Sequence, residues 1–373
     1  MRILLLYHSP WWNAAAYYGV TLAEGLQAAG HTVWFGTDKA SPSAQKAAAA
    51  GIGLFHILLQ TASPFGFLRQ IRRLAAFVNE HDIDLIDTFS PPGHLMYALG
   101  KRFYKIAVPL VRSCCDARKP NTNPLNKYLY RKCVDRLIFP CEAIRESYYE
   151  RVRFDRQRAS VIYPAIDLDR FDSNRQEISH DVSFEKNSPV VGIVARLSPE
   201  KGHEHFLKVA ARIVAVKRNV TFVVIGKEEQ ITVDALREHA DHLGIKENVV
   251  FTGFVNDPRK LMGDITIGVI ASRFSEAVSR AALEYFAAGK PVVATKVNVL
   301  SEIIEPGING FTYDIDDVTG MADGIQALLD DRKLYDTMAR NARDSVEKRY
   351  NLQKFTEETI AVYDNVLTGG GRG

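Results

Sequence analysis

The sequence has few of the features that mark membrane-spanning, secreted or disulfide-stabilised proteins. No apolar run approaches the roughly 18 to 20 residues that cross a bilayer, and the longest runs, such as 265–271, have the length of a strand. The N-terminus carries one basic residue and an apolar run that stops at His8, which is too short for a secretory signal. The four cysteines have neither zinc-site spacing nor the density of a disulfide scaffold. We therefore expect a cytoplasmic protein with reduced thiols.

Two motifs of other nucleotide-dependent enzymes are absent or weak. No Gly-x-Gly-x-x-Gly follows a strand-like segment, which argues against a dinucleotide oxidoreductase. Asp-x-Asp strings, which a metal-dependent transferase would use, occur at 82–84, 167–169 and 314–316. Each lies beside a helix end, before a strand or in a turn, where aspartate caps and bends the chain. We expect no metal site at any of them.

Charge is distributed unevenly along the chain. Residues 1–165 contain 21 basic and 12 acidic residues, whereas the rest of the chain is acidic. A basic half can attract nucleic acid, anionic lipid or an acidic glycan, or it can be a solvated surface. Within residues 67–78, Leu68, Ile71, Ala75 and Val78 share one helical face. This segment is therefore either a packed amphipathic helix or an interfacial helix at the inner face of the cell membrane.

Strand-like and helix-like segments alternate through the 373 residues, in two series. Continuous apolar or β-branched runs such as 190–195 and 221–225 are typical of parallel strands buried on both faces. Residues 172–189 between the two series are charged and without pattern, as in a linker. The sequence therefore predicts an α/β protein with two doubly wound, Rossmann-like parallel-sheet domains that face each other across a cleft. The expected parts are a domain over 1–170, a linker over 171–189, a domain over 190–351, and a helix at about 352–367 that packs back on the first domain.

Two cations follow the first strand of the second domain. Arg196 comes at the carboxyl end of the strand, and Lys201 precedes a helix that begins near His203. Ligands of open parallel sheets bind outside the carboxyl ends of the strands. Two cations beside free amides at such a turn suit a pyrophosphate, which arginine can grip with two hydrogen bonds.

Two glutamates follow a later strand of the same domain. Glu276 lies in the loop before a helix that Ser275 or Ser279 can cap, and Glu284 lies inside that helix among apolar residues. A buried carboxylate needs hydrogen-bond partners, and a ribose diol would supply two donors. The amides of 278–280 at the helix start favour an anion. The order carboxylate, amides, carboxylate can hold a sugar, a phosphate and a ribose.

Together, these residues resemble the family-4 retaining glycosyltransferases of the GT-B fold, over nearly the whole chain. The matching segments are VIYPAIDLDRF, VGIVARLSPEKG, VFTGFV, SEAVSRAALE with its E-x7-E spacing, AAGKPVVAT and EIIEPGINGF. The resemblance implies a nucleoside diphosphate donor held mainly by the C-terminal domain and an acceptor held mainly by the N-terminal one. It also implies transfer with retention, without a tightly bound cofactor or an essential metal, and with the leaving phosphate able to take the acceptor proton.

The resemblance assigns roles to particular residues. Glu276 would contact the donor sugar and Glu284 the ribose, while Arg196 and Lys201 would stabilise the charge on the departing phosphate. The catalytic set that it predicts is Glu276, Arg196, Lys201 and His94. The donor-binding set that it predicts is Glu284, Val278, Ser279, Arg280, Gly226, Phe254, Val255, Ala14 and Asn298.

Three positions depart from the family pattern. Asn13 and Ala14 stand where two glycines usually follow the first strand, and Asn298 precedes Val299 where two glycines are common. The family histidine near the fourth strand is missing, and His94 is the nearest candidate; it either contacts the sugar or phosphate or is an ordinary helix-start histidine. Trp11 and Trp12 either form the floor of the acceptor site or pack against neighbouring residues of the protein.

The sequence therefore predicts a retaining transferase that moves a hexose-type sugar from a UDP-sugar to a hydroxyl of a cell-envelope glycan, such as lipopolysaccharide or a lipid-linked saccharide. The expected partners are the donor, a glycan or glycolipid acceptor and an anionic membrane surface, and no nucleic acid. Two alternatives remain. One is a nucleotide-sugar 2-epimerase of the same architecture, and the other is a sugar-nucleotide sensor that binds donor without turnover.

Overall fold

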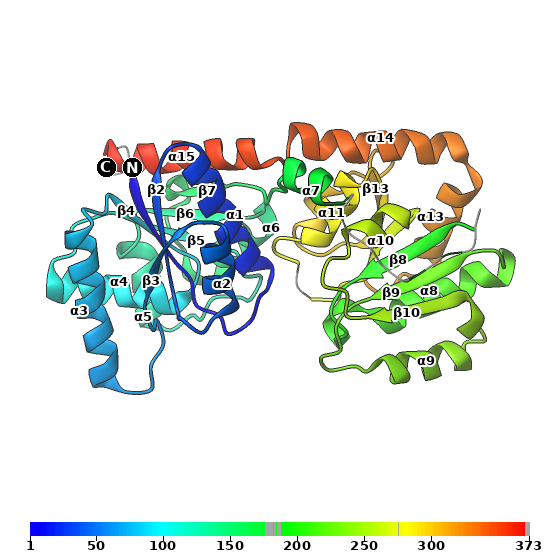
Figure 1. Ribbon diagram of the computed structural model, residues 1–373, viewed down its shortest axis with the longest axis horizontal. Helices are drawn as coiled ribbons and strands as arrows, with labels where there is room; N and C mark the ends of the chain where they lie inside the picture. Colours follow the sequence, from blue (N-terminus) through cyan, green and yellow to red (C-terminus); the bar gives the residue numbers. More distant parts are fainter. Residues whose placement is uncertain (176–181, 183, 185–187, 275, 370–373) are drawn as a thin grey trace. The chain divides into compact units, whose positions relative to one another are not determined.

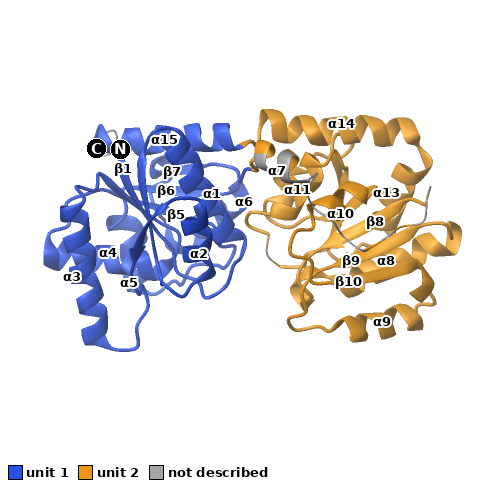
Figure 2. Ribbon diagram, viewed as in Figure 1, with its two compact units in different colours: residues 1–165, 352–373 blue, residues 166–351 orange. Residues whose placement is uncertain are grey.

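The chain forms two compact units in the computed structural model, which describes residues 1–175, 182, 184, 188–274 and 276–369. Unit 1 comprises residues 1–165 and 352–373, and unit 2 comprises residues 166–351 (Figure 2). Each unit is an α/β layer structure around one parallel sheet (Figure 1). The prediction of two Rossmann-like parallel-sheet domains is confirmed. Within the described residues, no helix is both long and apolar enough to cross a membrane.

Unit 1 contains a seven-stranded sheet in the order β3-β2-β1-β4-β5-β6-β7. All adjacent strands pair in parallel. The central strand β1 buries four of its five residues, which explains its continuous run of leucine and isoleucine. The strands are β1 (Arg2–Leu6), β2 (Thr32–Thr37), β3 (Gly53–His56), β4 (Leu85–Thr88), β5 (Leu110–Ser113), β6 (Arg136–Phe139) and β7 (Ala159–Val161).

Helices cover both faces of this sheet because the strand order reverses at β1. Parallel strands are joined by right-handed crossovers, so the connections from β1 to β3 lie on one face and those from β3 to β7 lie on the other. The first face carries α1 (Ala14–Ala28) and α2 (Pro42–Ala49), and α15 (Leu352–Leu367) packs against α1. The second face carries α3 (Pro64–Glu80), α4 (Pro91–Tyr104), α5 (Pro124–Lys132) and α6 (Glu142–Val152); the short helix η1 (Arg156–Arg158) precedes β7.

Unit 2 contains a six-stranded parallel sheet in the order β10-β9-β8-β11-β12-β13. Its strand order also reverses, at β8, so polar loops of β8 and β11 meet at the carboxyl edge. The strands are β8 (Val190–Val194), β9 (Thr221–Ile225), β10 (Val249–Gly253), β11 (Ile267–Ile270), β12 (Val292–Thr295) and β13 (Gly310–Tyr313). The helices are α7 (Leu168–Arg175), η2 (Pro199–Lys201), α8 (His203–Val216), α9 (Val233–His242), η3 (Lys246–Asn248), α10 (Arg259–Asp264), α11 (Arg280–Ala287), α12 (Leu300–Ile303), α13 (Val318–Asp330) and α14 (Arg332–Lys348).

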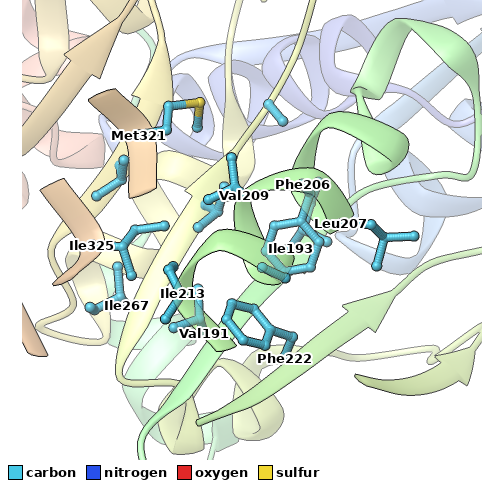
Figure 3. Packing of buried hydrophobic residues seen from close by; sticks show 14 of the residues in the cluster. Val191, Ile193, Phe206, Leu207, Val209, Ile213, Phe222, Ile267, Met321 and Ile325 are labelled. Carbon is cyan, nitrogen blue, oxygen red and sulfur yellow. The ribbon is translucent and has the colours of Figure 1, made fainter. Parts of the chain in front are cut away.

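A large part of the core of unit 2 lies between the sheet and helices, chiefly α8 and α13. Figure 3 shows Val191 and Phe222 of the sheet beside Phe206 of α8. Met321 and Ile325 of α13 complete the same cluster, and none of the five side chains is exposed. Burial of this apolar surface holds the strands in place, and so positions the loops at their carboxyl ends.

The structure corrects three local expectations. The segment assigned to a linker begins inside α7, which extends to Arg175; the rest of that segment lies largely outside the described residues. Leu68 was expected on the buried face of its helix but is 45% exposed, because Ile71 and Leu74 direct a different stripe toward the sheet. The helix also begins earlier than expected, at Pro64, after the cap Ser63. Proline suits the first turn, where its missing N–H is not needed.

Candidate active site

The loops after β8 and β11 lie side by side because these two strands are neighbours in the sheet. The backbone N–H of Arg273, which follows β11, donates to the carbonyl of Glu200 in the loop after β8, at 2.8 Å. Gly202 makes this approach possible. A Cβ atom at Gly202 would lie 2.0 Å from the Ala271 carbonyl oxygen, and its φ of +68° is one that glycine adopts without strain.

Glu276 is a buried carboxylate held between two partners. It is 7% exposed and forms an ion pair with Lys201. The Ser272 hydroxyl donates to the same oxygen, Oε1, at 2.5 Å. Ser272 is in turn fixed from β12, where the Thr295 hydroxyl donates to its backbone carbonyl at 2.5 Å. The carboxylate is thus preorganised at the carboxyl edge by groups from β8, β11 and β12.

The helix that follows, α11, begins in an unusual backbone conformation. Its N-cap residue Ser279 has φ +39° and ψ +59°, the left-handed region that non-glycine residues rarely adopt. Ser279 is 3% exposed, and its hydroxyl has no hydrogen-bond partner among the described residues. It therefore does not cap the helix in the usual way; the other predicted cap, Ser275, lies outside the described residues. Val278, just before Ser279, is buried as well.

Glu284 lies one turn into α11 and is 4% exposed. Arg280 Nε donates to its Oε1 at 2.6 Å, which compensates the buried charge. A second pair, Asp257 and Arg259, lies close enough to influence both residues electrostatically. Burial opposes ionisation of Asp257, but hydrogen bonds from Arg259 hold its pKa below the ordinary value. The ribose side of the predicted site is therefore a network of two carboxylates and two guanidinium groups.

Arg196 follows β8 and reaches the surface, where two carboxylates hold its guanidinium group. Its Nη2 donates to Glu200 at 2.9 Å, and its Nη1 pairs with Glu229. All three side chains are about half exposed. Ion pairs at such exposure contribute only about 0 to 1 kcal/mol, so a doubly charged phosphate could exchange with them at little cost.

The loop after β12 closes over Glu276. The backbone N–H of Val299 donates to the Glu276 carbonyl at 3.2 Å. Asn298, just before it, has φ +44°, which explains why glycine is common at this place in the family pattern. Asparagine tolerates the left-handed region better than most residues. Asn298 therefore lies beside Glu276, although the two residues are far apart in the sequence.

A cavity of ≈ 570 Å³ opens near the ends of β9 and β10. Its walls include Lys227, Arg237 and Phe251, with Gly253 and Phe254 at the strand end. Gly226 brings these strands together, since its N–H donates to the Gly253 carbonyl at 3.0 Å and a Cβ would lie 1.8 Å from the Ala195 oxygen. Phe254 is 67% exposed and Val255 is half-buried. An exposed aromatic ring beside a cavity of this kind suits a planar base.

Two predicted site residues belong to unit 1. Ala14 is the exposed first residue of α1, whose N-cap Asn13 accepts hydrogen bonds from the Ala16 N–H and the Tyr7 hydroxyl. His94 is 1% exposed in the first turn of α4, and its ring meets Tyr130 edge-on, with ring centroids 5.2 Å apart. Burial, assisted by the nearby Arg112 charge, lowers the pKa of His94 to about 3. This packed, neutral state favours the interpretation of His94 as a buried helix-start histidine.

The tryptophans after β1 differ from each other in exposure. Trp11 is 72% exposed and Trp12 is half-buried. An exposed tryptophan at the carboxyl edge of the unit 1 sheet is compatible with a stacking platform for a sugar, and the half-buried one with packing. Both interpretations of the pair stay open.

Two of the three Asp-x-Asp strings lie beside basic side chains. Asp82 and Asp84 pair with Arg2, Asp314 with Lys296, and Asp316 with Arg273. Among the described residues there is no cluster of three or more His, Cys, Asp or Glu side chains that could hold a metal ion.

Several groups that surround the predicted residues were not predicted from the sequence. Ser272, Asp257 and Arg259 contact or influence the two glutamates, and Glu200 and Glu229 hold Arg196. Their only sequence signal is position, since each lies within a few residues of a strand's carboxyl end. Ser272 and Glu200 contact side chains close to them in the sequence. Lys201 and Glu229 reach their partners from the loops of other strands, which residue spacing could not reveal.

Two Rossmann-like parallel sheets, one in each unit, are the architecture of the GT-B class of proteins. Two family models match the chain: "Glycosyltransferase Family 4" over residues 15–170 and "Glycosyl transferases group 1" over residues 174–345. The chain belongs to the family-4 glycosyltransferases of the GT-B fold.

Relatives and solved structures agree with this assignment. An uncharacterized glycosyltransferase of Methanocaldococcus jannaschii, MJ1607, is 27% identical over 65% of this chain and 63% of its own length. An alpha-D-kanosaminyltransferase of Streptomyces kanamyceticus is 29% identical over 48% of this chain and 46% of its own. The chain thus spans from about a half to under two thirds of the curated relatives it matches. Anabaena Alr3699/HepE, solved with UDP, superposes with a TM-score of 0.84 at 22% identity, over 98% of this chain and 100% of that one.

Proposed function

We propose that this chain transfers a hexose-type sugar from a UDP-sugar to a hydroxyl of a cell-envelope glycan, with retention of the anomeric configuration. The observation that carries the proposal is the position of Glu276. Its carboxylate is buried between Lys201 and Ser272, at the carboxyl edge where β8 and β11 adjoin. A carboxylate at this place can accept hydrogen bonds from sugar hydroxyls next to the phosphate that leaves.

The two cations would bind the diphosphate and stabilise the charge that develops on it. Lys201 can turn from Glu276 toward a phosphate oxygen, and Arg196 can exchange its surface carboxylates for one. The amides at the start of α11 add partial positive charge. Preorganised donors of this kind are each worth about 10²- to 10³-fold in rate. These groups supply the positive charge that other transferases take from a metal, so we infer that a chelator leaves turnover unchanged.

Glu284 would hold the ribose, and the cavity at Phe254 would hold the base. Arg280 orients the Glu284 carboxylate through a hydrogen bond, and the carboxylate can accept both hydrogen bonds of a ribose diol. The basic Lys227 and Arg237 in the cavity wall suit the electron-rich edge of uracil. Val278, Ser279, Gly226, Val255, Ala14 and Asn298 complete the proposed donor-binding set.

Support for the donor and the acceptor comes from the relatives. Alr3699/HepE has been solved with UDP and with UDP-glucose. WaaB, described as a lipopolysaccharide outer core galactosyltransferase, shares the fold with a TM-score of 0.75 at 13% identity. CapM of Staphylococcus aureus, 28% identical over 53% of this chain, is described as a capsular polysaccharide glycosyltransferase. An acceptor carried on a lipid would require the enzyme to work at a membrane surface.

A donor screen followed by turnover assays tests the proposal. We expect a UDP-hexose to raise the thermal unfolding midpoint and to be hydrolysed slowly without acceptor. Glu276→Ala should lower turnover by about 10²-fold or more with an unchanged circular dichroism spectrum, whereas Glu247→Gln, at an exposed surface site, should not. Full activity of the alanine variant would refute the role of Glu276.

The same assays separate the two alternatives. Incubation with donor alone, followed by proton NMR, would show an isomerised sugar for a 2-epimerase and free UDP for a transferase. A sensor would give the thermal shift and no product with any acceptor.

A further inference from the structure

Three helices of unit 1 present a shared outer surface. Helices α3, α4 and α5 all connect strands that run from β3 toward β6, so right-handed crossovers place them in one layer on the same face of the sheet. Helix α4 packs against both neighbours; for example, Gly100 lies against Ile71 of α3. Figure 1 shows the three helices together on one flank of unit 1. Their surface away from the sheet is called the α3–α5 face here.

The α3–α5 face carries large apolar side chains in the open. Phe65 at the start of α3 is 85% exposed, and Leu68 one turn later is 45% exposed. Phe103 at the end of α4 is 63% exposed, and Leu125 and Tyr128 of α5 are 54% and 58% exposed. Single exposed apolar residues are ordinary, but five on one helical layer indicate a surface that is covered in use.

The same face is strongly basic. The three helices contain eight Lys and Arg residues and one acidic residue, Glu80, which is the last residue of α3. Within the described part of the chain, no carboxylate pairs with Arg69, Arg72, Lys101 or Arg102. By contrast, Arg145 and Arg156 of the neighbouring α6 region are paired with Glu146. The positive charge of the α3–α5 face is therefore left for an external partner.

Helix α3 combines both properties in one stripe. Phe65, Leu68, Arg69 and Arg72 follow the i, i+3, i+4, i+7 spacing and are all exposed. Ile71, Leu74 and Val78 form the opposite stripe and are buried against unit 1. One side of the helix thus packs its apolar residues against unit 1. The other side presents both apolar and cationic side chains to solvent.

We propose that the α3–α5 face docks on an anionic lipid bilayer. Each Lys or Arg near such a surface contributes to binding, and exposed aromatic and leucine side chains can enter the headgroup–acyl boundary. Nucleic acid would match the positive charge but would leave the aliphatic Leu68 and Leu125 in contact with phosphates and water. This proposal goes beyond sugar transfer, because it depends only on the surface of unit 1.

Vesicle flotation tests the proposal. The full chain should float with phosphatidylcholine–phosphatidylglycerol vesicles at low salt and not with phosphatidylcholine alone. Arg69→Glu with Arg72→Glu should weaken binding more than about tenfold. The matched control is Lys39→Glu with Lys46→Glu, which changes net charge equally at exposed positions outside the α3–α5 face, on the connection from β2 to β3 and its helix α2. The control should float like the native chain.

A second variant tests the apolar part. Phe65→Ser with Phe103→Ser should leave low-salt binding partly intact but abolish the fraction that resists high salt, since screening removes only the electrostatic component. Absence of flotation at low salt, or equal loss in both charge-reversal variants, would overturn the proposal. So would binding to duplex DNA without binding to vesicles.

The donor-induced thermal shift is measured on every variant. A retained shift shows that the fold and the donor site are intact, so loss of vesicle binding then concerns the surface alone. If the native chain shows no donor-induced thermal shift, the proposed transferase function is contradicted. The vesicle-binding result would still stand.

Discussion

Lys201 and Glu276 are 75 positions apart in the sequence and form an ion pair at the carboxyl edge of the unit 2 sheet. The lysine follows β8 and the glutamate follows β11, and the reversal of strand order makes these strands neighbours. The pair therefore joins the two loops that would hold the donor's diphosphate and sugar. It also gives the buried Glu276 carboxylate a partner of opposite charge.

Lys201→Met should destabilise unit 2 by leaving Glu276 buried without its cation. We expect a loss of about 2 kcal/mol in the free energy of unfolding, measured by urea denaturation. Adding Glu276→Gln should restore at least half of that loss, because a neutral amide needs no cation. Additive losses in the double variant would show that the pair does not stabilise the fold. Both single variants should lose turnover.

Two substitutions of Ser279 separate the effect of its strained backbone from the effect of its hydroxyl group. Ser279→Gly should raise the free energy of unfolding by about 1 kcal/mol, since glycine adopts a φ of +39° without strain. Ser279→Ala keeps the strain and removes the hydroxyl, so its stability should be nearly unchanged. If the hydroxyl donates to the donor phosphate, both variants should raise the donor KM about tenfold or more. An unchanged KM in both would assign Ser279 a purely structural role.

Buried neutral histidines should make the protein acid-sensitive. The pKa of His94 is lowered to about 3, and that of His203 to about 4, in both cases mainly by burial. An unfolded histidine binds its proton near pH 6.5, so between that pH and the folded value the unfolded chain binds more protons. Stability should therefore be full above about pH 6.5 and fall on acidification by about 1 kcal/mol per pH unit for each group.

The contribution of His94 can be measured directly. His94→Gln should flatten the decline of the thermal midpoint between about pH 6.5 and 4, even if it lowers stability at neutral pH. His242→Gln, at an exposed histidine, should leave the slope as it is. An unchanged slope in His94→Gln would mean that His94 accepts a proton in the folded state.

Gly226→Ala should damage the donor site through the backbone. The added Cβ would meet the Ala195 carbonyl oxygen, so the ends of β8 and β9 must separate. We expect a loss of about 1 to 3 kcal/mol in stability together with loss of the donor-induced thermal shift. Gly244→Ala is the control, because its site is open and only its φ of +71° is unfavourable. It should cost about 1 kcal/mol and leave donor binding unchanged.

Secondary structure was predicted most accurately where the local sequence pattern and the tertiary packing agree. The strand-like runs 190–195 and 221–225 form β8 and β9, because continuous apolar sequence and burial on both faces of the sheet agree there. Strands β3, β6, β7 and β13 were not identified from the sequence, since a segment of three or four residues carries no readable period. Leu68 was assigned to the wrong face because helical spacing alone allows two nearby stripes, and contact with the sheet selects one.

The residue types of the site were also readable, whereas their pairing was not. Arg196 and Glu276 could be placed at strand ends, because polar residues after buried parallel strands lie at the ligand-binding edge. That Glu276 meets Lys201, and that Arg196 is held by Glu229, depends on strand order. Residue spacing within one segment contains no information about the order of the strands in the sheet.

The sequence by itself therefore determined the fold class, the two-domain organisation and the family, because periodicity and short motifs are local properties of the chain. Only the tertiary structure decided which charges neutralise one another, which histidines stay neutral, and which helices share the α3–α5 face. These depend on burial and on distances between segments far apart in sequence. Both are set by the packing of the sheets and not by any one segment.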